Sequence, residues 1–199
     1  MSAIQKLTDW FVTFPGIGPR QARRFVYFLL TQNPSQLAEL SDLIKQLPNE
    51  VMQCTQCFRF TMQHAGSSIC DICRSKNREN ILMIVARDSD LEAVEKSRAF
   101  NGTYFVLGGT ITPLGKDARD QVRLTELEKR VHSPAPTEII IALGANPEGD
   151  YTTNILKEAL QGAPNCPPIS TLGRGLSTGT ELEYSDHSTI ESALENRRI

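Results

Sequence analysis

Four cysteines in two closely spaced pairs constrain this chain more than any other feature of its sequence. Cys54 and Cys57 form one Cys-x-x-Cys pair, Cys70 and Cys73 form the second, and twelve residues separate the two pairs. Two such pairs at this separation can surround one Zn²⁺ ion tetrahedrally. Because four cysteines leave no open coordination position, the pattern predicts a structural zinc site that takes part in no chemical step.

The same cysteines could instead be buried or redox-active thiols. That alternative fits poorly, because the loop at residues 63–68 between the pairs is polar and does not suit an apolar core. The N-terminus carries no export signal, so we expect a cytoplasmic protein whose thiols stay reduced, which favours a metal over disulfides. His64 in this loop offers a further ligand, but the fourth cysteine makes it unnecessary.

Charge is distributed unevenly along the 199 residues, although the net charge is only −2. Residues 1–78 hold nine Lys/Arg and five Asp/Glu, whereas residues 79–199 hold twelve and eighteen. This distribution favours phosphate binding by the N-terminal part and another kind of partner for the acidic part. No apolar run approaches the ~20 residues of a membrane span, so we expect no membrane association.

Hydrophobic periodicity predicts helices over residues 1–47, interrupted by turns at Pro15-Gly16 and Asn33-Pro34. After the cysteine pairs, short apolar runs alternate with helical stretches. The expected strands are 81–85, 104–107 and 138–143, and the expected helices are 90–99, 120–131 and 151–160. This alternation predicts a multidomain α and α/β chain with a mostly parallel sheet, covered by helices on both faces.

Residues 14–20 lie between two of the expected N-terminal helices and predict the turn of a helix-hairpin-helix. Gly16 and Gly18 let the backbone approach a phosphate, and the next helix offers free N–H groups at its positive dipole end. Nearby positive charge comes from Arg20, Arg23 and Arg24. The pattern indicates contacts to the backbone of DNA without sequence preference. The alternative is an ordinary turn whose arginines are only solvated.

Five motifs follow one another in a characteristic order. They are Pro15-Gly16-Ile17-Gly18-Pro19-Arg20, the four cysteines, Leu107-Gly108-Gly109 with Pro113-Leu114, Glu148-Gly149, and Leu182-Glu183-Tyr184 with Asp186. Over nearly its whole length the chain therefore resembles the RecR family of recombination mediators. The resemblance implies a helix-hairpin-helix domain over 1–52, a four-cysteine zinc motif over 53–78, a Toprim domain over 79–165 and a C-terminal segment over 166–199.

The resemblance also implies a function and partners. RecR-like proteins are non-catalytic, DNA-binding mediators of recombinational repair, and they assemble into ring-like dimers or tetramers. With RecO, and in some systems RecF, they help load the recombinase RecA onto gapped DNA coated by single-strand-binding protein. For this chain we therefore expect single-stranded or gapped DNA, a RecO-like protein, and in some systems a RecF-like protein, as partners.

Catalytic Toprim domains need a Glu after the first strand and an Asp-x-Asp after the third, because paired carboxylates hold Mg²⁺. Here Ala86 follows the first strand, and residues 143–146 contain no acid. The sequence therefore predicts that the chain is not an enzyme. Two alternatives stay open: a Mg²⁺-dependent Toprim enzyme resembling a primase or nuclease, and an adaptor whose hairpin serves only self-association.

Acidic residues nevertheless follow two of the expected strands. Asp88, Asp90 and Asp150 are expected to be helix N-caps, with a weak metal or basic-partner site as the alternative. Capping does not explain Glu148, which we predict contacts a basic partner. The loops here differ from the usual family pattern, so the partner surface is less well defined than the DNA surface. Residues 173–179 are glycine-rich but lack a P-loop ending and predict a flexible loop.

Overall fold

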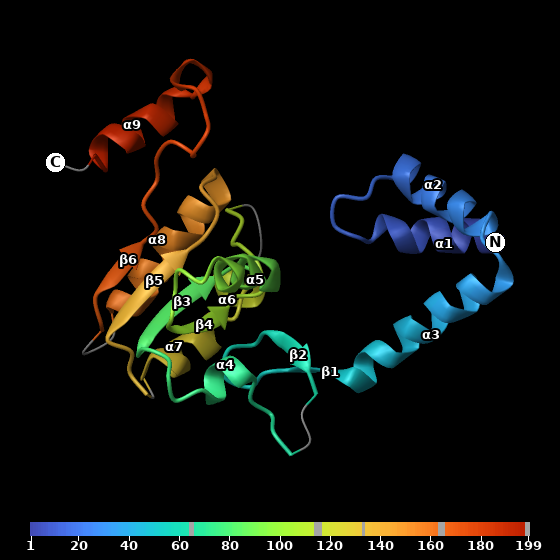
Figure 1. Ribbon diagram of the computed structural model, residues 1–199, viewed down its shortest axis with the longest axis horizontal. Helices are drawn as coiled ribbons and strands as arrows, with labels where there is room; N and C mark the ends of the chain where they lie inside the picture. The colour runs from blue at the N-terminus through green and yellow to red at the C-terminus, as the bar shows by residue number, and fades with distance from the viewer. Residues whose placement is uncertain (64–65, 114–116, 133, 163–165, 198–199) are drawn as a thin grey trace. The chain divides into compact units, whose positions relative to one another are not determined.

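The chain divides into two compact units, Met1–Val51 and Met52–Ile199, in a computed structural model (Figure 1). The structure describes residues 1–63, 66–113, 117–132, 134–162 and 166–197. His64, Leu114 and residues 115–116 lie outside the described residues. The finer domain boundaries expected after residues 52, 78 and 165 stay predictions.

The N-terminal unit consists of three helices, as the periodicity predicted. They are α1 (Ala3–Val12), α2 (Pro19–Leu30) and α3 (Pro34–Glu50). The first helix begins after Ser2, whose hydroxyl accepts a hydrogen bond from the Gln5 N–H at 3.3 Å. The third begins after Asn33, whose side chain accepts from the Gln36 N–H at 2.9 Å. These caps satisfy backbone donors that a helix start leaves free, which is why the helices begin where they do.

The first two helices of this unit pack against each other, whereas the third buries none of its side chains. Ala22 and Val26 of α2 are almost fully buried, and the rings of Phe11 and Phe25 meet edge to face with centroids 5.9 Å apart. The apolar side chains along α3 are therefore exposed.

The second unit is built around a four-stranded parallel sheet in the order β4-β3-β5-β6. Its strands are β3 (Ile81–Val85), β4 (Thr103–Val106), β5 (Glu138–Ala142) and β6 (Ile169–Thr171). The three strands predicted from apolar runs are confirmed, with β6 added at one edge. Because the strands are parallel, all their carboxyl ends, and the acids that follow them, lie along one edge of the sheet.

Helices connect these strands, and two of them differ from the sequence prediction. The helical elements are α4 (Asp71–Arg74), α5 (Asp88–Ser97), α6 (Ala118–Gln121), α7 (Leu124–His132), α8 (Pro147–Gln161), η1 (Leu182–Tyr184) and α9 (His187–Glu195). The helix expected at 120–131 is broken between α6 and α7, where the Arg123 N–H donates to the Leu107 carbonyl at 3.0 Å. The helix expected from residue 151 begins at Pro147, because Asn146 caps it.

Each face of the sheet carries its own core. On one face Leu82, Ile84 and Phe105 pack with apolar side chains of α7 and α8. On the other face Met83 and Val85 pack with side chains that include three of the four motif cysteines. The four-cysteine motif is therefore part of the sheet's hydrophobic core. Together with α5 it covers that face of the sheet.

In the part of the chain that the structure describes, no helix combines the length and the apolar character needed to cross a bilayer.

Candidate metal centre and nucleic-acid surface

The four cysteine sulfurs gather at one point of the structure. Their ligand atoms all lie within 4.8 Å of one another, and Cys57 Sγ is 3.6 Å from Cys70 Sγ. A tetrahedral zinc site with Zn–S bonds of ~2.3 Å requires sulfur–sulfur distances of about 3.8 Å. The cluster therefore has the size and the donor set of a closed metal site, as the spacing of the pairs predicted.

Hydrogen bonds of the backbone shape the two Cys-x-x-Cys pairs. The Cys70 N–H donates to Cys54 Sγ at 3.3 Å and so joins the two pairs directly. The Phe58 N–H donates to the Cys54 carbonyl at 2.9 Å, and the Arg74 N–H donates to the Cys70 carbonyl at 3.0 Å. Each pair thus closes a tight turn that points both of its sulfurs to the same side.

The proximity of four thiols makes their ionisation interdependent. Hydrogen bonds with the neighbouring cysteines, above all with Cys57, lower the pKa of Cys54, whereas the hydrogen bond with Cys54 raises the pKa of Cys57. One thiolate is therefore favoured at the expense of its neighbour. A divalent cation removes this conflict, because it binds every sulfur in the deprotonated form.

Phe58 connects the first Cys-x-x-Cys pair to the sheet. It has a left-handed backbone with φ of +61°, which is rare for an aromatic residue and costs free energy. Its ring meets Phe105 edge to face at 5.4 Å, and the guanidinium of Arg123 lies over it at 5.4 Å. These two contacts of the ring offset the backbone cost and help to fix the position of Cys57 beside it.

Two further hydrogen bonds connect the motif to the strands. The Val106 N–H on edge strand β4 donates to the Cys57 carbonyl at 2.8 Å. Two strands, β1 (Val51–Gln53) and β2 (Phe60–Met62), pair in a small sheet on either side of the first cysteine pair. At the start of β2, the Phe60 N–H donates to the Asp88 carboxylate at 2.7 Å. The motif and the carboxyl edge of the main sheet are therefore one hydrogen-bonded structure.

A partly buried ion pair completes this attachment at the end of the motif. The guanidinium of Arg78 donates to both carboxylate oxygens of Glu95 on α5, at 2.7 and 2.8 Å. The Tyr104 hydroxyl on β4 donates to the same carboxylate at 2.7 Å. Arg78 lowers the pKa of Glu95, so this acid stays charged and the bidentate contact persists.

The N-cap predictions for three aspartates are wrong. Asp90 instead accepts from the Arg87 N–H at 2.9 Å as the third residue of α5, and Asp88 binds the cysteine motif as described. The cap of α8 is Asn146, whose side chain accepts from the Gly149 N–H at 2.8 Å. Asp150 pairs with the guanidinium of Arg174, which lowers its pKa. Sequence reasoning missed Arg174, because nothing local links residues twenty-four positions apart.

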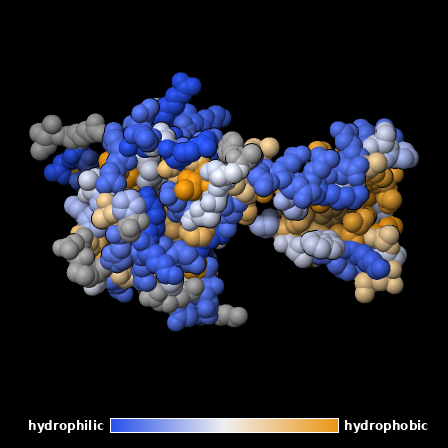
Figure 2. All heavy atoms as spheres, turned by 90° about the horizontal axis from the view of Figure 1, so that it is seen from below, coloured by the Kyte–Doolittle hydropathy of each residue, from blue (hydrophilic) through white to orange (hydrophobic). Residues whose placement is uncertain are grey.

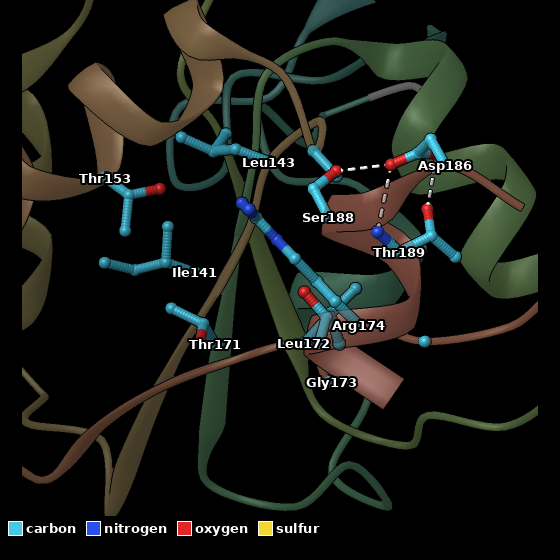
Figure 3. Close-up of a pocket in the computed structure, with 13 residues that line it drawn as sticks. Ile141, Leu143, Thr153, Thr171, Leu172, Gly173, Arg174, Asp186, Ser188 and Thr189 are labelled. Carbon is cyan, nitrogen blue, oxygen red and sulfur yellow. Dashed lines mark hydrogen bonds between the residues drawn. The ribbon is translucent and has the colours of Figure 1, made fainter. Parts of the chain in front are cut away.

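Arg174 lies in a cavity of about 460 Å³ between the sheet edge and the C-terminal segment. In Figure 3 its side chain extends across the cavity toward Leu143 and Thr153. On the opposite side Asp186 accepts from the Thr189 N–H at 3.0 Å and caps α9. The stretch expected to be only a flexible loop therefore contributes an ion pair that ties the C-terminal segment to α8.

Glu148 is exposed on the first turn of α8, at the carboxyl edge of the sheet. Its carboxylate accepts a hydrogen bond from the Thr110 hydroxyl at 3.2 Å. The next residue must be glycine, because a Cβ on Gly149 would lie 1.9 Å from the Gly144 carbonyl oxygen. This close approach explains the Glu-Gly motif, and it holds the Glu148 backbone against the loop that follows β5.

The hairpin of the N-terminal unit leaves its backbone open. Gly16 has φ of +76°, a conformation that favours glycine, and a Cβ on either Gly16 or Gly18 would have no neighbour within 4 Å. Gly18 is the N-cap of α2 and offers no side chain, and Pro19 occupies the first turn. The N–H groups at the start of α2 therefore lack a side-chain partner and are available to an anion.

The three hairpin arginines, Arg20, Arg23 and Arg24, are exposed, and none has a hydrogen-bond or ion-pair partner among the residues described. They line one groove of about 320 Å³ together with Pro19 and Tyr27. Tyr27 was missed at the sequence level, although its position seven residues after Arg20 places it on the same helical face. The structure thus brings the predicted cations and an aromatic ring into one groove.

Comparison with known families matches three models to separate parts of the chain. They are the RecR helix-hairpin-helix over residues 4–47, the Toprim domain over residues 80–167 and the RecR C-terminal model over residues 175–198. The matched parts appear in the order that the motifs predicted.

Similar proteins cover the chain almost completely. The recombination protein RecR of Parasynechococcus marenigrum (strain WH8102) is 40% identical over 194 residues, which is 97% of each chain. Those of Paracoccus denitrificans (strain Pd 1222) and Paenarthrobacter aurescens (strain TC1) are 37% and 36% identical, over 98% of this chain and 96% of each relative. The chain therefore belongs to the RecR family of recombination proteins.

Proposed function

We propose that this chain is a non-catalytic recombination mediator that binds single-stranded or gapped DNA through its N-terminal hairpin. It acts as a homo-oligomeric ring and, with a RecO-like partner and in some systems a RecF-like partner, helps load a RecA-type recombinase. The observation that carries the proposal is the convergence of three unpaired arginines on the uncapped start of α2. The cytoplasmic location expected from the sequence stays a prediction.

The affinity of the hairpin for DNA should come mainly from contacts with the DNA backbone, not with the bases. Free N–H groups, the positive end of the helix dipole and three guanidinium groups all attract phosphate. Phosphates are the same in every sequence, so such contacts give affinity without sequence preference. The proposal therefore fits a mediator that must act wherever DNA is gapped.

Replacing both Arg20 and Arg24 with alanine should weaken binding to all DNA sequences alike. Each lost phosphate contact should make the slope of log affinity against log salt shallower, by about 0.9 on duplex and about 0.7 on single strands. Fluorescence anisotropy titrations at several salt concentrations measure both quantities. Lys6→Ala, an exposed substitution on α1 outside the groove, is the matched control and should leave the slope unchanged.

Unchanged affinity and salt slope in a folded, assembled Arg20→Ala/Arg24→Ala protein would contradict the proposal. The hairpin would then serve only self-association, and DNA binding would belong to another surface.

The sheet edge supports a non-catalytic role. Ala86 follows β3, and the loop after β5 holds no acid before Glu148. The aspartates that remain at this edge already bind protein groups: Asp88 the Phe60 N–H, Asp90 the Arg87 N–H and Asp150 the Arg174 guanidinium. Paired carboxylates free for Mg²⁺ are needed for Toprim catalysis. A Mg²⁺-dependent synthesis or cleavage assay tests the enzymatic alternative.

We assign the metal at the cysteine cluster as Zn²⁺. Four thiolate donors in a closed tetrahedral arrangement are the usual environment of structural zinc. The ion would be held by Cys54, Cys57, Cys70 and Cys73 and would supply folding free energy.

Glu148 is proposed to contact the basic RecO-like partner. Glu148→Lys should weaken this binding, because it replaces an attraction with a repulsion, while DNA binding should be unchanged or slightly stronger. A desolvated charge pair of this kind is worth about 2–5 kcal/mol. Glu158→Lys, an exposed reversal farther along α8, is the matched control and should bind the partner normally. Calorimetry with a RecO-like protein measures the affinities, and equal values for both variants would remove Glu148 from the interface.

Self-association is supported by apolar side chains that the N-terminal unit leaves exposed. Figure 2 shows hydrophobic residues gathered over this unit, at the right of the view. Trp10 of α1 is 69% exposed, and α3 presents a stripe at helical spacing that comprises Leu37, Leu40, Leu43, Ile44 and Leu47. An apolar stripe of this length on one helix is a typical association surface.

A further inference from the structure

Tyr27 lines the hairpin's charged groove and is not part of the buried core of its unit. Arg20, Arg23, Arg24 and Tyr27 follow the spacing i, i+3, i+4 and i+7, so they share one face of α2 and together line the groove. The Tyr27 side chain is 54% exposed. Within the described part of the chain its ring stacks on no other ring, and its hydroxyl has no hydrogen-bond partner.

The core of the unit does not account for this tyrosine. The α2 face that packs on α1 is formed by Ala22 and Val26, both nearly fully buried. Tyr27 is not among the buried side chains of that helix. A large ring that is half exposed and shares a groove with three unpaired cations is better suited to a ligand that carries both negative charge and flat apolar surface.

We propose that Tyr27 is a stacking platform for a base of single-stranded DNA whose phosphates are held by the three hairpin arginines. This inference rests on the proposed DNA-binding function of the hairpin. A single strand offers free base faces next to its phosphates, whereas a duplex hides its base faces inside the stack. Tyr27 therefore makes the hairpin prefer single-stranded DNA, which defines the substrate class of this site.

Charge argues against a second copy of the chain as the occupant of the groove. In a two-fold symmetric interface centred on this groove, Arg20, Arg23 and Arg24 would face the same three arginines of the other copy. Like charges placed against each other in an interface cost several kcal/mol. The uncharged apolar stripe on α3 is available for association without this cost.

Phe28 provides an internal comparison. It is the next residue of α2 and is equally exposed, at 61%, but its own groove contains only one of the arginines, Arg24, with Gln21 and Phe25. Its ring therefore lies outside the set of three cations that would hold the DNA backbone. Phe28→Leu is the matched control for Tyr27→Leu, because each substitution replaces one exposed ring with one leucine.

The test compares three probes of equal length: oligothymidine, a strand of abasic phosphodiesters, and a duplex. Tyr27→Leu should weaken oligothymidine binding by between about fivefold and about 150-fold, the range for loss of one base-aromatic stack. Abasic and duplex binding and all salt slopes should be unchanged, because no phosphate contact is lost. Tyr27→Phe, which keeps a ring, should restore oligothymidine binding, and Phe28→Leu should preserve the preference for oligothymidine over the abasic strand.

Several outcomes overturn the inference. Normal oligothymidine binding by Tyr27→Leu would show that no base stacks there. Equal losses on all three probes, accompanied by a lower solution mass, would show that a second copy covers the ring. Failure of the wild-type protein to bind any probe would overturn the proposed function as well. If salt-dependent binding is lost in Arg20→Ala/Arg24→Ala but kept in Tyr27→Leu, the proposed function stands and only the role of Tyr27 is rejected.

Discussion

Replacing Cys57 with serine should lower the thermal stability of the whole unit formed by residues 52–199, not only of the cysteine motif. Structural zinc sites contribute an apparent ~10–16 kcal/mol, which exceeds the ~5–15 kcal/mol that stabilises a typical domain. Loss of one ligand should therefore remove most of the metal's contribution and leave the unit partly or wholly unfolded. Calorimetric melting, with metal analysis expected to give about one ion per wild-type chain, measures the effect.

The reason for a unit-wide effect is that the cysteines belong to the core of the sheet. Cys54, Cys57 and Cys70 are fully buried in the same cluster as Met83 and Tyr104. The Cys57 carbonyl also satisfies an amide of the edge strand through Val106. Without the metal, no cation joins the four sulfurs in this core. The motif that covers this face of the sheet is then no longer held in place.

Cys166 is the matched control for this prediction. It is a partly buried cysteine outside the metal cluster, so Cys166→Ser should cost only about 1 kcal/mol, the typical effect of one substitution. Metal-free wild-type protein that melts at the same temperature as the metal-loaded form would contradict a structural role for the site. Melting in which only residues near the cysteines unfold would contradict their integration with the sheet.

The sequence was sufficient to predict the features that depend on local pattern. Paired cysteines indicate a metal site because their spacing alone fixes a closed donor set. Apolar runs such as residues 81–85 indicate buried strands, since a parallel sheet is covered on both faces. Gly16 marks a turn because its left-handed backbone, with φ of +76°, favours glycine. Each of these signals lies within a few residues and needs no knowledge of distant contacts.

The acids at the sheet edge were misread because their partners are distant in sequence. Asp88 binds the backbone of Phe60, and Asp150 binds Arg174, so neither needs the helix end beside it. The capping role at α8 belongs to Asn146, four residues earlier, with proline in the first turn. That signal was available in the sequence, since Asn followed by Pro is a common helix start. The two tertiary contacts were not available, because no local rule links such positions.

A double substitution on α3, Leu40→Glu with Ile44→Glu, should convert the proposed homo-oligomer to single chains. These side chains are 43% and 58% exposed in one chain and belong to the apolar stripe that has no partner within it. Burying them in an interface is favourable, whereas burying two unpaired carboxylates there is strongly unfavourable. Light scattering measures the solution mass of the variant and of the wild type.

The same variant should lose DNA affinity although its hairpin is intact. One hairpin offers only three arginines, so strong binding requires several hairpins on one DNA, and linked sites can gain about 10²- to 10⁴-fold in affinity. The control is Ala38→Glu with Gln46→Glu, which adds the same two charges to the polar side of α3. The control should keep both mass and affinity, which separates loss of assembly from simple repulsion of DNA. An oligomer of unchanged mass in the Leu40→Glu/Ile44→Glu protein would place the interface elsewhere, and a monomer that still binds DNA at full strength would show that one hairpin is enough.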